Sequence, residues 1–345
     1  MTDILQDLIN VCSNEYASVV SDGTLTDSTN YVDTGSYMLN ALLSGSIFKG
    51  FPTNKILGLQ GESATGKTYF LLSIIKNFLL ADPNARVMLF ETESAISKKM
   101  LEERGIPIDR VGIVPVVTVQ QFRTQALRVA EKYNEVKAEG KPLLLALDSL
   151  GMLSTEKELN DVRDGNEIRD MTRAQLIKGT FRVLTLKLAQ AGIPMIVTNH
   201  VYFSPNSFSG PEAGGGTGLK YAASYIVNLT KRKEKEGTDV VGNVITCTLL
   251  KGRDTKENSK VQVLLNYATG LNKFYGLVDL ASEAELLKKV STRYELADGR
   301  KFFEKQIYRN PQEVFTDDLL QSLDEYANNK FTYGRITTDV IEEDE

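Results

Sequence analysis

Hydrophobic and polar residues repeat with two different periods along this chain. Short apolar runs that predict buried strands stand at residues 55–60, 86–90, 111–114, 143–148 and 193–199. Between them, apolar residues recur at helical spacing over residues 69–80, 119–136 and 174–190. Later apolar runs, at 225–229, 244–250 and 261–265, follow one another without a helical pattern between them. The pattern predicts an α/β fold with a mostly parallel central sheet and an antiparallel extension.

The two ends of the chain read as smaller parts. We expect residues 1–30 to form an oligomerisation helix and linker, 31–282 the core, and 283–345 a small C-terminal region, helical at 284–290 and 317–328. The helix packs either on its own domain or on a neighbouring subunit, because the polar linker after it permits both. The C-terminal acidic tail is either a solvated terminus or a brake on the binding of a polyanionic partner.

The first strand is followed by a phosphate-loop motif, G-x-x-x-x-G-K-S/T. Its residues are Gly61, Glu62, Ser63, Ala64, Thr65, Gly66, Lys67 and Thr68, and Tyr69 continues into the predicted helix. The glycines let backbone N–H groups wrap phosphates, and the helix N-terminus attracts anions. We expect Lys67 to reach the β- and γ-phosphates and Thr68 to ligate Mg²⁺. The motif predicts ATP and Mg²⁺ as cofactors.

Polar side chains follow three other predicted strands. Asp148 ends an aliphatic strand and is expected to hold the metal through water, the alternative being that it caps the next helix. Glu91 and Glu93 stand at another strand end. Either could polarise the water that attacks the γ-phosphate, the alternative being that both are solvated loop acids. His200, the single histidine, is either a core imidazole or a sensor of the γ-phosphate. Ligands bind at this edge of open α/β sheets.

Two polar stretches, 154–169 and 201–218, are predicted to be long irregular loops that bind a polymer. Aromatic side chains, glycine N–H groups and cations are what a nucleic-acid strand needs from such loops. The candidates in and around these loops are Tyr202, Phe203, Phe208, Gly214, Gly215, Gly216, Arg163, Arg169, Arg173, Lys178, Arg182 and Lys220. The alternative for each cation is an ordinary solvated surface charge.

Composition and charge narrow the class of partner and the cellular compartment that we expect for this protein. The net charge of −5 does not indicate a nucleic-acid binder, but a local basic loop can bind DNA on an acidic protein. Two cysteines, Cys12 and Cys247, imply no disulfide framework and a reducing compartment. The acidic N-terminus lacks a signal peptide, and no apolar run is long enough to span a membrane. We expect a cytoplasmic protein, in the host cytoplasm if the source is viral.

Several motifs together resemble RecA-type recombinases. They are GESATGKT, FETES, LLLALDSLG, DMTRAQLIKGTFR, TNHVYF, GGGTGLKY and LLKGRDTKENSK with YGLVDLA, in the order found in that family. The chain is most similar to the UvsX-like recombinases of myoviruses, a bacteriophage group. The resemblance extends over about residues 30–282.

The resemblance implies roles position by position. Glu93 matches the family's catalytic glutamate, and Lys251 and Arg253 match cations that reach the nucleotide of the next subunit. His200 stands where bacterial RecA has glutamine. Met100 stands where bacterial RecA stacks an aromatic ring on adenine. Residues 156–169 and 201–216 resemble the two DNA-binding loops.

The implied activity is that of a DNA-dependent ATPase. An ATP-dependent DNA recombinase would form helical filaments on single-stranded DNA and pair it with homologous duplex DNA in recombination, repair and recombination-dependent replication. A single-strand-binding protein and a loader are further partners of such a protein. The alternatives are a RecA-fold hexameric helicase, or an ATP-switched DNA-coating or mediator protein without strand exchange.

Overall fold

The computed structural model of the 345-residue chain describes residues 4–27, 30–165, 171–202, 212–213 and 218–334. Two compact units make up the chain. The first combines residues 1–32 and 52–224, and the second combines residues 33–51 and 225–345.

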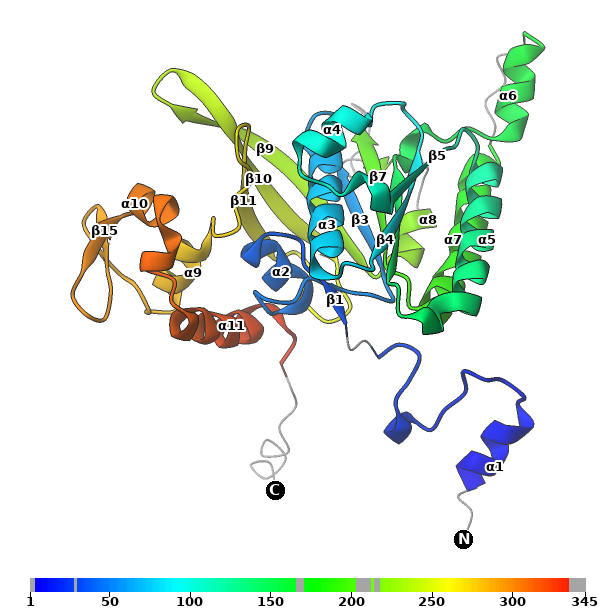
Figure 1. Ribbon diagram of the computed structural model, residues 1–345, viewed down its shortest axis with the longest axis horizontal. Coiled ribbons are helices and arrows are strands. Elements are labelled where there is room, and N and C mark those ends of the chain that lie inside the picture. The colour runs from blue at the N-terminus through cyan, green and yellow to red at the C-terminus, as the bar shows by residue number, and fades with distance from the viewer. Residues whose placement is uncertain (1–3, 28–29, 166–170, 203–211, 214–217, 335–345) are drawn as a thin grey trace. The chain divides into compact units, whose positions relative to one another are not determined.

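The first unit is built on parallel strands in the order β3-β7-β6-β4-β5. The strands are β3 (Ile56–Gly61), β4 (Arg86–Glu91), β5 (Val111–Pro115), β6 (Leu143–Asp148) and β7 (Met195–Tyr202). The longer helices are α3 (Lys67–Ala81), α5 (Val119–Val136) and α7 (Arg173–Ala191). Figure 1 shows α3 across the sheet and α5 and α7 side by side. All six residues of β6 are buried, which is why its sequence is continuously apolar up to Asp148.

Shorter elements complete the first unit. They are α1 (Ile4–Val11), β1 (Tyr31–Val32), α4 (Lys98–Glu103), α6 (Glu156–Arg163), β8 (Glu212–Ala213) and α8 (Gly218–Ala222). Helix α5 shows how the sequence sets the boundaries. Thr118 and Gln121 form a capping box at its start, and Phe122, Ala126 and Ala130 line its buried face. The ring of Phe122 meets Phe90 of β4 edge to face at 5.3 Å, fixing the helix on the sheet.

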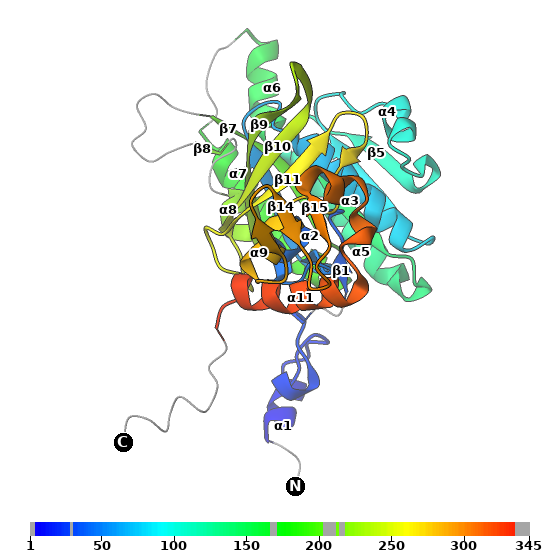
Figure 2. The same cartoon turned by 90° about the vertical axis from the view of Figure 1, so that its left-hand side faces the viewer.

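The second unit carries antiparallel strands in the order β9-β10-β11-β12, followed by a three-stranded sheet, β13-β14-β15 (Figure 2). The strands are β9 (Tyr225–Glu236), β10 (Asp239–Lys251), β11 (Lys260–Asn266), β12 (Gly270–Leu271), β13 (Lys288–Val290), β14 (Arg293–Glu295) and β15 (Lys301–Phe303). The helices are α2 (Tyr37–Ser44), α9 (Leu277–Glu283), α10 (Glu304–Arg309) and α11 (Asp317–Phe331). Strand β2 (Phe51–Pro52) lies where the units meet in sequence. The expected fold class, a mostly parallel core with an antiparallel extension, is confirmed.

Three local predictions were wrong. Residues 156–163 are helix α6 and not an irregular loop, because Thr155 and Glu158 form a capping box. Residues 284–290 are not a helix. Glu285 has a φ of 58°, which ends the helical segment, and residues 288–290 pair with 293–295. Strand β7 runs on past Asn199, because Val201 and Tyr202 pair with β8.

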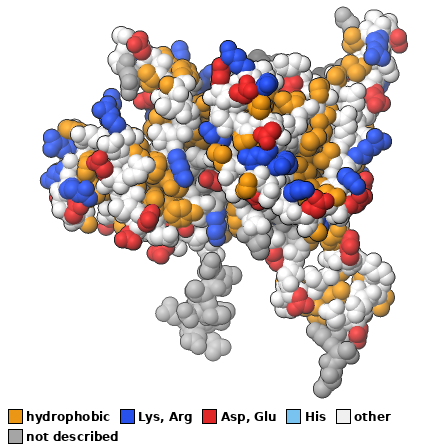
Figure 3. Space-filling model, viewed as in Figure 1, with side chains coloured by type: hydrophobic (Ala, Val, Ile, Leu, Met, Phe, Trp, Pro, Cys, Tyr) orange, Lys and Arg blue, Asp and Glu red, His pale blue; other side chains and the backbone are white. Residues whose placement is uncertain are grey.

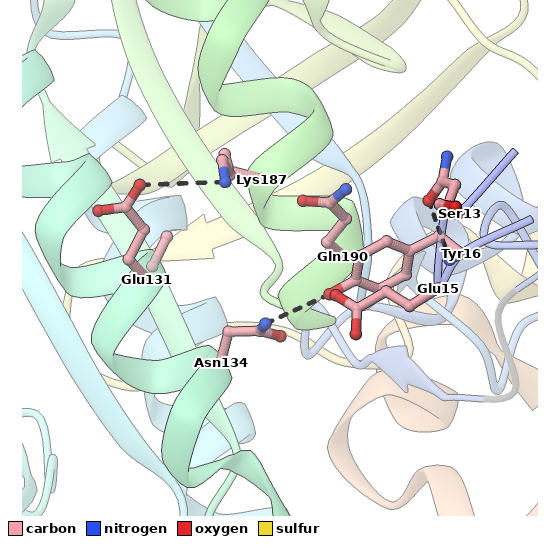
Figure 4. Close-up of a pocket in the computed structure, with 9 residues that line it drawn as sticks. Ser13, Glu15, Tyr16, Glu131, Asn134, Lys187 and Gln190 are labelled. Atoms are coloured by element: carbon pink, nitrogen blue, oxygen red, sulfur yellow. Dashed lines mark hydrogen bonds and ion pairs between the residues drawn. The ribbon is translucent and has the colours of Figure 1, made fainter.

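The N-terminal segment contacts its own unit through Tyr16 and through the carbonyls of residues 25–27, which accept hydrogen bonds from the side chains of Asn54 and Lys55. None of the α1 residues is buried. The Tyr16 hydroxyl accepts a hydrogen bond from Asn134 of α5 at 3.3 Å. A cavity of about 550 Å³ lies beside this contact (Figure 4). Among the residues that line it, Lys187 Nζ lies 3.9 Å from Glu131 Oε1. The boundaries at residues 30 and 282 stay a prediction.

The surface gives no sign of segregated charge on the face that Figure 3 shows, where acidic and basic side chains are interspersed. Within the described ranges, no helix is both long and apolar enough to cross a membrane.

Candidate active site

The loop between β3 and α3 has the backbone geometry of an anion cradle. Ala64 and Gly66 have positive φ angles of 57° and 93°, which turn successive N–H groups toward one side. The Thr65 hydroxyl donates to the Glu62 carbonyl at 2.9 Å and holds the loop closed. Helix α3 starts directly afterwards, so its positive end faces the same space. The loop can therefore bind phosphate groups.

Lys67 is buried at the base of this loop, with 5% of its surface exposed. Its Nζ donates to the carbonyls of Gly61 and Glu62 at 3.0 and 2.8 Å and lies 3.3 Å from His200 Nδ1. Burial lowers the pKa of Lys67, while the Asp148 and Glu93 carboxylates act in the opposite direction. The ammonium is thus fixed where the phosphates of a nucleotide would lie.

Asp148 is joined to the phosphate loop by a hydroxyl. Thr68 Oγ1 donates to Asp148 Oδ2 at 2.7 Å, and Thr198 Oγ1 of β7 donates to Oδ1. Burial raises the pKa of Asp148, and these two hydrogen bonds oppose that shift. A hydroxyl whose proton points to a carboxylate keeps its lone pairs available, and hydroxyl and carboxylate oxygens are the ligands that Mg²⁺ prefers. The residues present therefore fit a magnesium ion.

The two glutamates at the end of β4 have different partners. Glu91 is 6% exposed, and its carboxylate accepts hydrogen bonds from the backbone N–H groups of Glu93, Ser94 and Ala95 at 2.7–3.1 Å. Glu93 Oε1 accepts from Ser149 Oγ at 2.8 Å and lies 3.4 Å from His200 Nε2. Glu91 therefore shapes its own loop, and Glu93 is the carboxylate that faces the imidazole and Lys67.

His200 lies between Lys67 and Glu93. An ammonium group can only donate, so Nδ1 accepts from Lys67. In the neutral ring the proton then sits on Nε2 and is directed to Glu93 Oε1. The imidazole side chain is 19% exposed. It is therefore not enclosed in an apolar core. Because the ring contacts both the Lys67 ammonium and the Glu93 carboxylate, a movement of one group can be transmitted through it to the other.

Arg104, which the sequence did not suggest, contacts Tyr69 and Met100, two residues predicted to bind the nucleotide. The Arg104 guanidinium carbon lies 4.9 Å from the centre of the Tyr69 ring, and Nη1 donates to the Met100 carbonyl at 3.1 Å. Arg104 thereby ties α4 to the first turn of α3. A cation four residues after Met100 on a helix was the available signal.

The predicted DNA contacts are partly described. Lys178, Arg182 and Lys220 are exposed, as is Arg163 at the end of α6. Lys178 Nζ lies 5.2 Å from the centre of the exposed Tyr221 ring, which the sequence reasoning missed. Arg173 differs, since its guanidinium donates to the carbonyls of residues 151 and 153, both at 2.7 Å. Outside the described residues lie Arg169, Phe203, Phe208, Gly214, Gly215 and Gly216, and Tyr202 is described by its backbone alone.

Lys251 and Arg253 lie in the second unit, at the end of β10 and in the loop after it. Gly252 between them admits no side chain, because a Cβ there would lie 2.7 Å from Leu249 Cδ2 and 2.8 Å from the Thr255 carbonyl. Tyr225, fully buried, donates its hydroxyl proton to Asp254 in the same loop. The loop that carries the two cations is therefore fixed within its own unit.

Comparison with known proteins gives one consistent answer. The RecA N-terminal domain model matches residues 14–272. The chain is 29% identical to the "Recombination and repair protein" of Enterobacteria phage T4 over 289 residues, which is 84% of this chain and 73% of that protein. It is 27% identical to "Protein RecA" of Clavibacter michiganensis subsp. michiganensis over 81% of this chain and 76% of that protein. It is 26% identical to "Protein RecA" of Mycoplasmopsis pulmonis over 87% of this chain and 86% of that protein.

The match covers the phosphate loop, both acidic strand ends, His200 and the loop with Lys251 and Arg253. Membership implies ATP binding, which agrees with the cradle, the buried lysine and the strand-end acids. The expected resemblance is confirmed: this chain belongs to the RecA family of recombination proteins.

Proposed function

We propose that this protein is an ATP-dependent DNA recombinase that forms helical filaments on single-stranded DNA and exchanges it with a homologous duplex. The proposal extends family membership to a specific reaction, and it includes DNA-dependent ATP hydrolysis. The observation that carries it is the contact of His200 with both Lys67 and Glu93. His200 lies on β7, whose last two residues, Val201 and Tyr202, begin the second predicted DNA-binding loop, 201–216.

In hydrolysis, Glu93 would orient and polarise the water that attacks the γ-phosphate, and Ser149 would hold the carboxylate for that task. Lys67 and the N–H groups of the phosphate loop would stabilise the charge that develops on the phosphate oxygens. Thr68 and Asp148, the latter through water, would hold Mg²⁺, which when bound neutralises part of the triphosphate charge.

Coupling to DNA follows from the position of His200. When a γ-phosphate attracts the Lys67 ammonium, the acceptor at His200 Nδ1 loses its donor, and the ring and β7 adjust. Because β7 leads into residues 203–216, the nucleotide state would alter the grip of that loop on the DNA backbone. This is a population shift driven by a difference in contacts between the ATP and ADP forms.

Filament formation would complete the site. Lys251 and Arg253 would reach the nucleotide bound by the next subunit, where added positive charge favours the transition state. Basic side chains beside the two loops, such as Lys178 of α7 and Lys220 of α8, would contact phosphates, while base pairing with the duplex supplies sequence specificity. A single-strand-binding protein and a loader would act before this filament forms.

Electron microscopy of the protein with single-stranded DNA and a non-hydrolysable ATP analogue tests the assembly. We expect open helical filaments, and closed rings would support the hexameric helicase instead. Joint-molecule formation between a circular single strand and a homologous linear duplex tests the reaction. Filaments that form without joint molecules would indicate a DNA-coating or mediator protein.

A further inference from the structure

Thr198 places a polar group inside an otherwise apolar strand. The three residues before it in β7, Met195, Ile196 and Val197, are fully buried, and Thr198 itself is 0% exposed. A buried hydroxyl without a partner destabilises a protein, so a partner is expected. Thr198 Oγ1 donates to Asp148 Oδ1, and the Leu147 carbonyl lies 3.4 Å from the same hydroxyl.

The strand register brings these two side chains together. Strands β6 and β7 are parallel neighbours, and Leu147 is paired with Val197. One residue further along each strand stand Asp148 and Thr198, whose side chains point to the same face of the sheet. On its other side Thr198 is paired with Leu59 of β3, the strand that leads into the phosphate loop. The contact is therefore built into the core.

Two hydroxyls from different elements thus hold the two oxygens of one carboxylate. Thr68 comes from the first turn of α3 and Thr198 from the middle of β7. With only one of them, the Asp148 carboxylate could rotate about its χ2 angle, which is broad for aspartate. With both, its plane is fixed, and so is the direction in which it presents lone pairs to a water on Mg²⁺.

We propose that Thr198 is a positioning residue that orients Asp148 for Mg²⁺-dependent nucleotide binding. The inference rests on the proposed function in one respect, that Asp148 acts on the metal. Partners of this kind, which orient a metal-site carboxylate without touching the metal, typically contribute 10–100-fold to metal affinity or activity. Thr198 is expected to contribute through the metal alone, because it lies behind Asp148 and not in the phosphate loop.

The test is Thr198→Val, which keeps the shape of the side chain and removes the donor. We would titrate Mg²⁺ against the purified full chain with a fluorescent ATP analogue and record anisotropy. The Mg²⁺ concentration for half-maximal binding is expected to rise about 10–100-fold. Binding of the analogue in EDTA is expected to match the wild type, and Thr198→Ser, which restores the hydroxyl, should restore the wild-type Mg²⁺ requirement.

Thr180→Val is the matched control. Thr180 is also buried, at 1% exposure, but its hydroxyl has no hydrogen-bond partner among the described residues. This control should leave the Mg²⁺ requirement unchanged. If both valine variants shift it equally, or if Thr198→Ser fails to restore it, Thr198 has only a packing role and the inference is overturned.

A double-mutant cycle with Asp148→Asn tests the route of the effect. If Thr198 acts through Asp148, adding Thr198→Val to Asp148→Asn should change the Mg²⁺ requirement by less than twofold. An undiminished effect in that background would contradict the inference. A wild-type protein that binds the analogue equally well in Mg²⁺ and in EDTA would instead contradict the proposed role of Asp148 itself.

Discussion

The two glutamates at the end of β4 give the sharpest prediction, because the same substitution should affect a different property at each. Glu93→Gln should lower turnover, and Glu91→Gln should lower thermal stability. In Glu93→Gln the amide oxygen can still accept from Ser149 Oγ, which lies 2.8 Å from the carboxylate. The fold is therefore expected to be unchanged. The charge that polarises the attacking water is lost, and general-base contributions are typically 10²–10⁴-fold, so turnover should fall by about that factor.

In Glu91→Gln the structural cost dominates. Three backbone N–H groups point at the Glu91 carboxylate at 2.7–3.1 Å, on both of its oxygens. An amide offers one oxygen, so its NH₂ group must face at least one of these donors. Losing one charge-assisted hydrogen bond costs about 1.5–3 kcal/mol, which lowers the Tm by roughly 3–12 °C.

The assay combines three measurements on each variant: phosphate release with saturating single-stranded DNA, affinity for a non-hydrolysable ATP analogue, and thermal unfolding. Glu93→Gln should lose turnover while keeping both analogue affinity and Tm, and its filaments should persist. Glu91→Gln should lose Tm. The reasoning is refuted if Glu93→Gln hydrolyses ATP at the native rate, or if Glu91→Gln loses turnover at an unchanged Tm.

Three further predictions concern charge. Lys67→Ala should weaken binding of the ATP analogue at least ~100-fold in equilibrium titrations, because it removes more than one charge-assisted hydrogen bond; near-native affinity would contradict this. Lys251→Ala should lower DNA-stimulated hydrolysis while leaving analogue binding to free subunits unchanged, and full stimulation would argue against a site completed by the next subunit. Burial raises the pKa of Asp148 in the folded protein, so the protonated side chain stabilises the fold and this contribution is lost as pH rises through the folded-state pKa. The Tm of the wild type minus the Tm of Asp148→Asn should therefore increase as pH falls from 7 toward 4. A decrease would contradict the direction of the pKa shift.

Where the hydrophobic pattern was strong, the sequence alone predicted the bounds of helices and strands. Helix α5 and strand β6 have the bounds that the pattern predicts, 119–136 and 143–148. The phosphate loop was recognised because its chemistry requires specific residues at fixed spacing. These features depend on neighbours in sequence, so they can be read from one chain.

Features that depend on distant partners could not be read. The pattern of residues 284–290 is helical, but their pairing with residues 293–295 and the left-handed Glu285 decide their structure. Helix α6 has a visible capping box and yet no apolar period, so its charge indicated a loop. The contact of Thr198 with Asp148 joins residues 50 positions apart and follows from strand register alone.

Glu91 and Glu93 illustrate the same limit at the site. Both are acids after a strand, and alternation along the strand no longer holds where the chain turns. Only the folded loop reveals that Glu91 is occupied by backbone N–H groups while Glu93 faces His200. Residue type located the site and the family resemblance pointed to Glu93, while the backbone fold gives the physical difference between the two carboxylates.

The central claim is that the nucleotide bound at the phosphate loop sets the grip of the protein on a DNA strand. It is tested most directly by the dissociation constant for one single-stranded oligonucleotide, measured at fixed salt with a non-hydrolysable ATP analogue and with ADP. We expect markedly tighter binding with the analogue, and a loss of that difference in His200→Ala. Equal dissociation constants for the wild type in the two nucleotide states would contradict it.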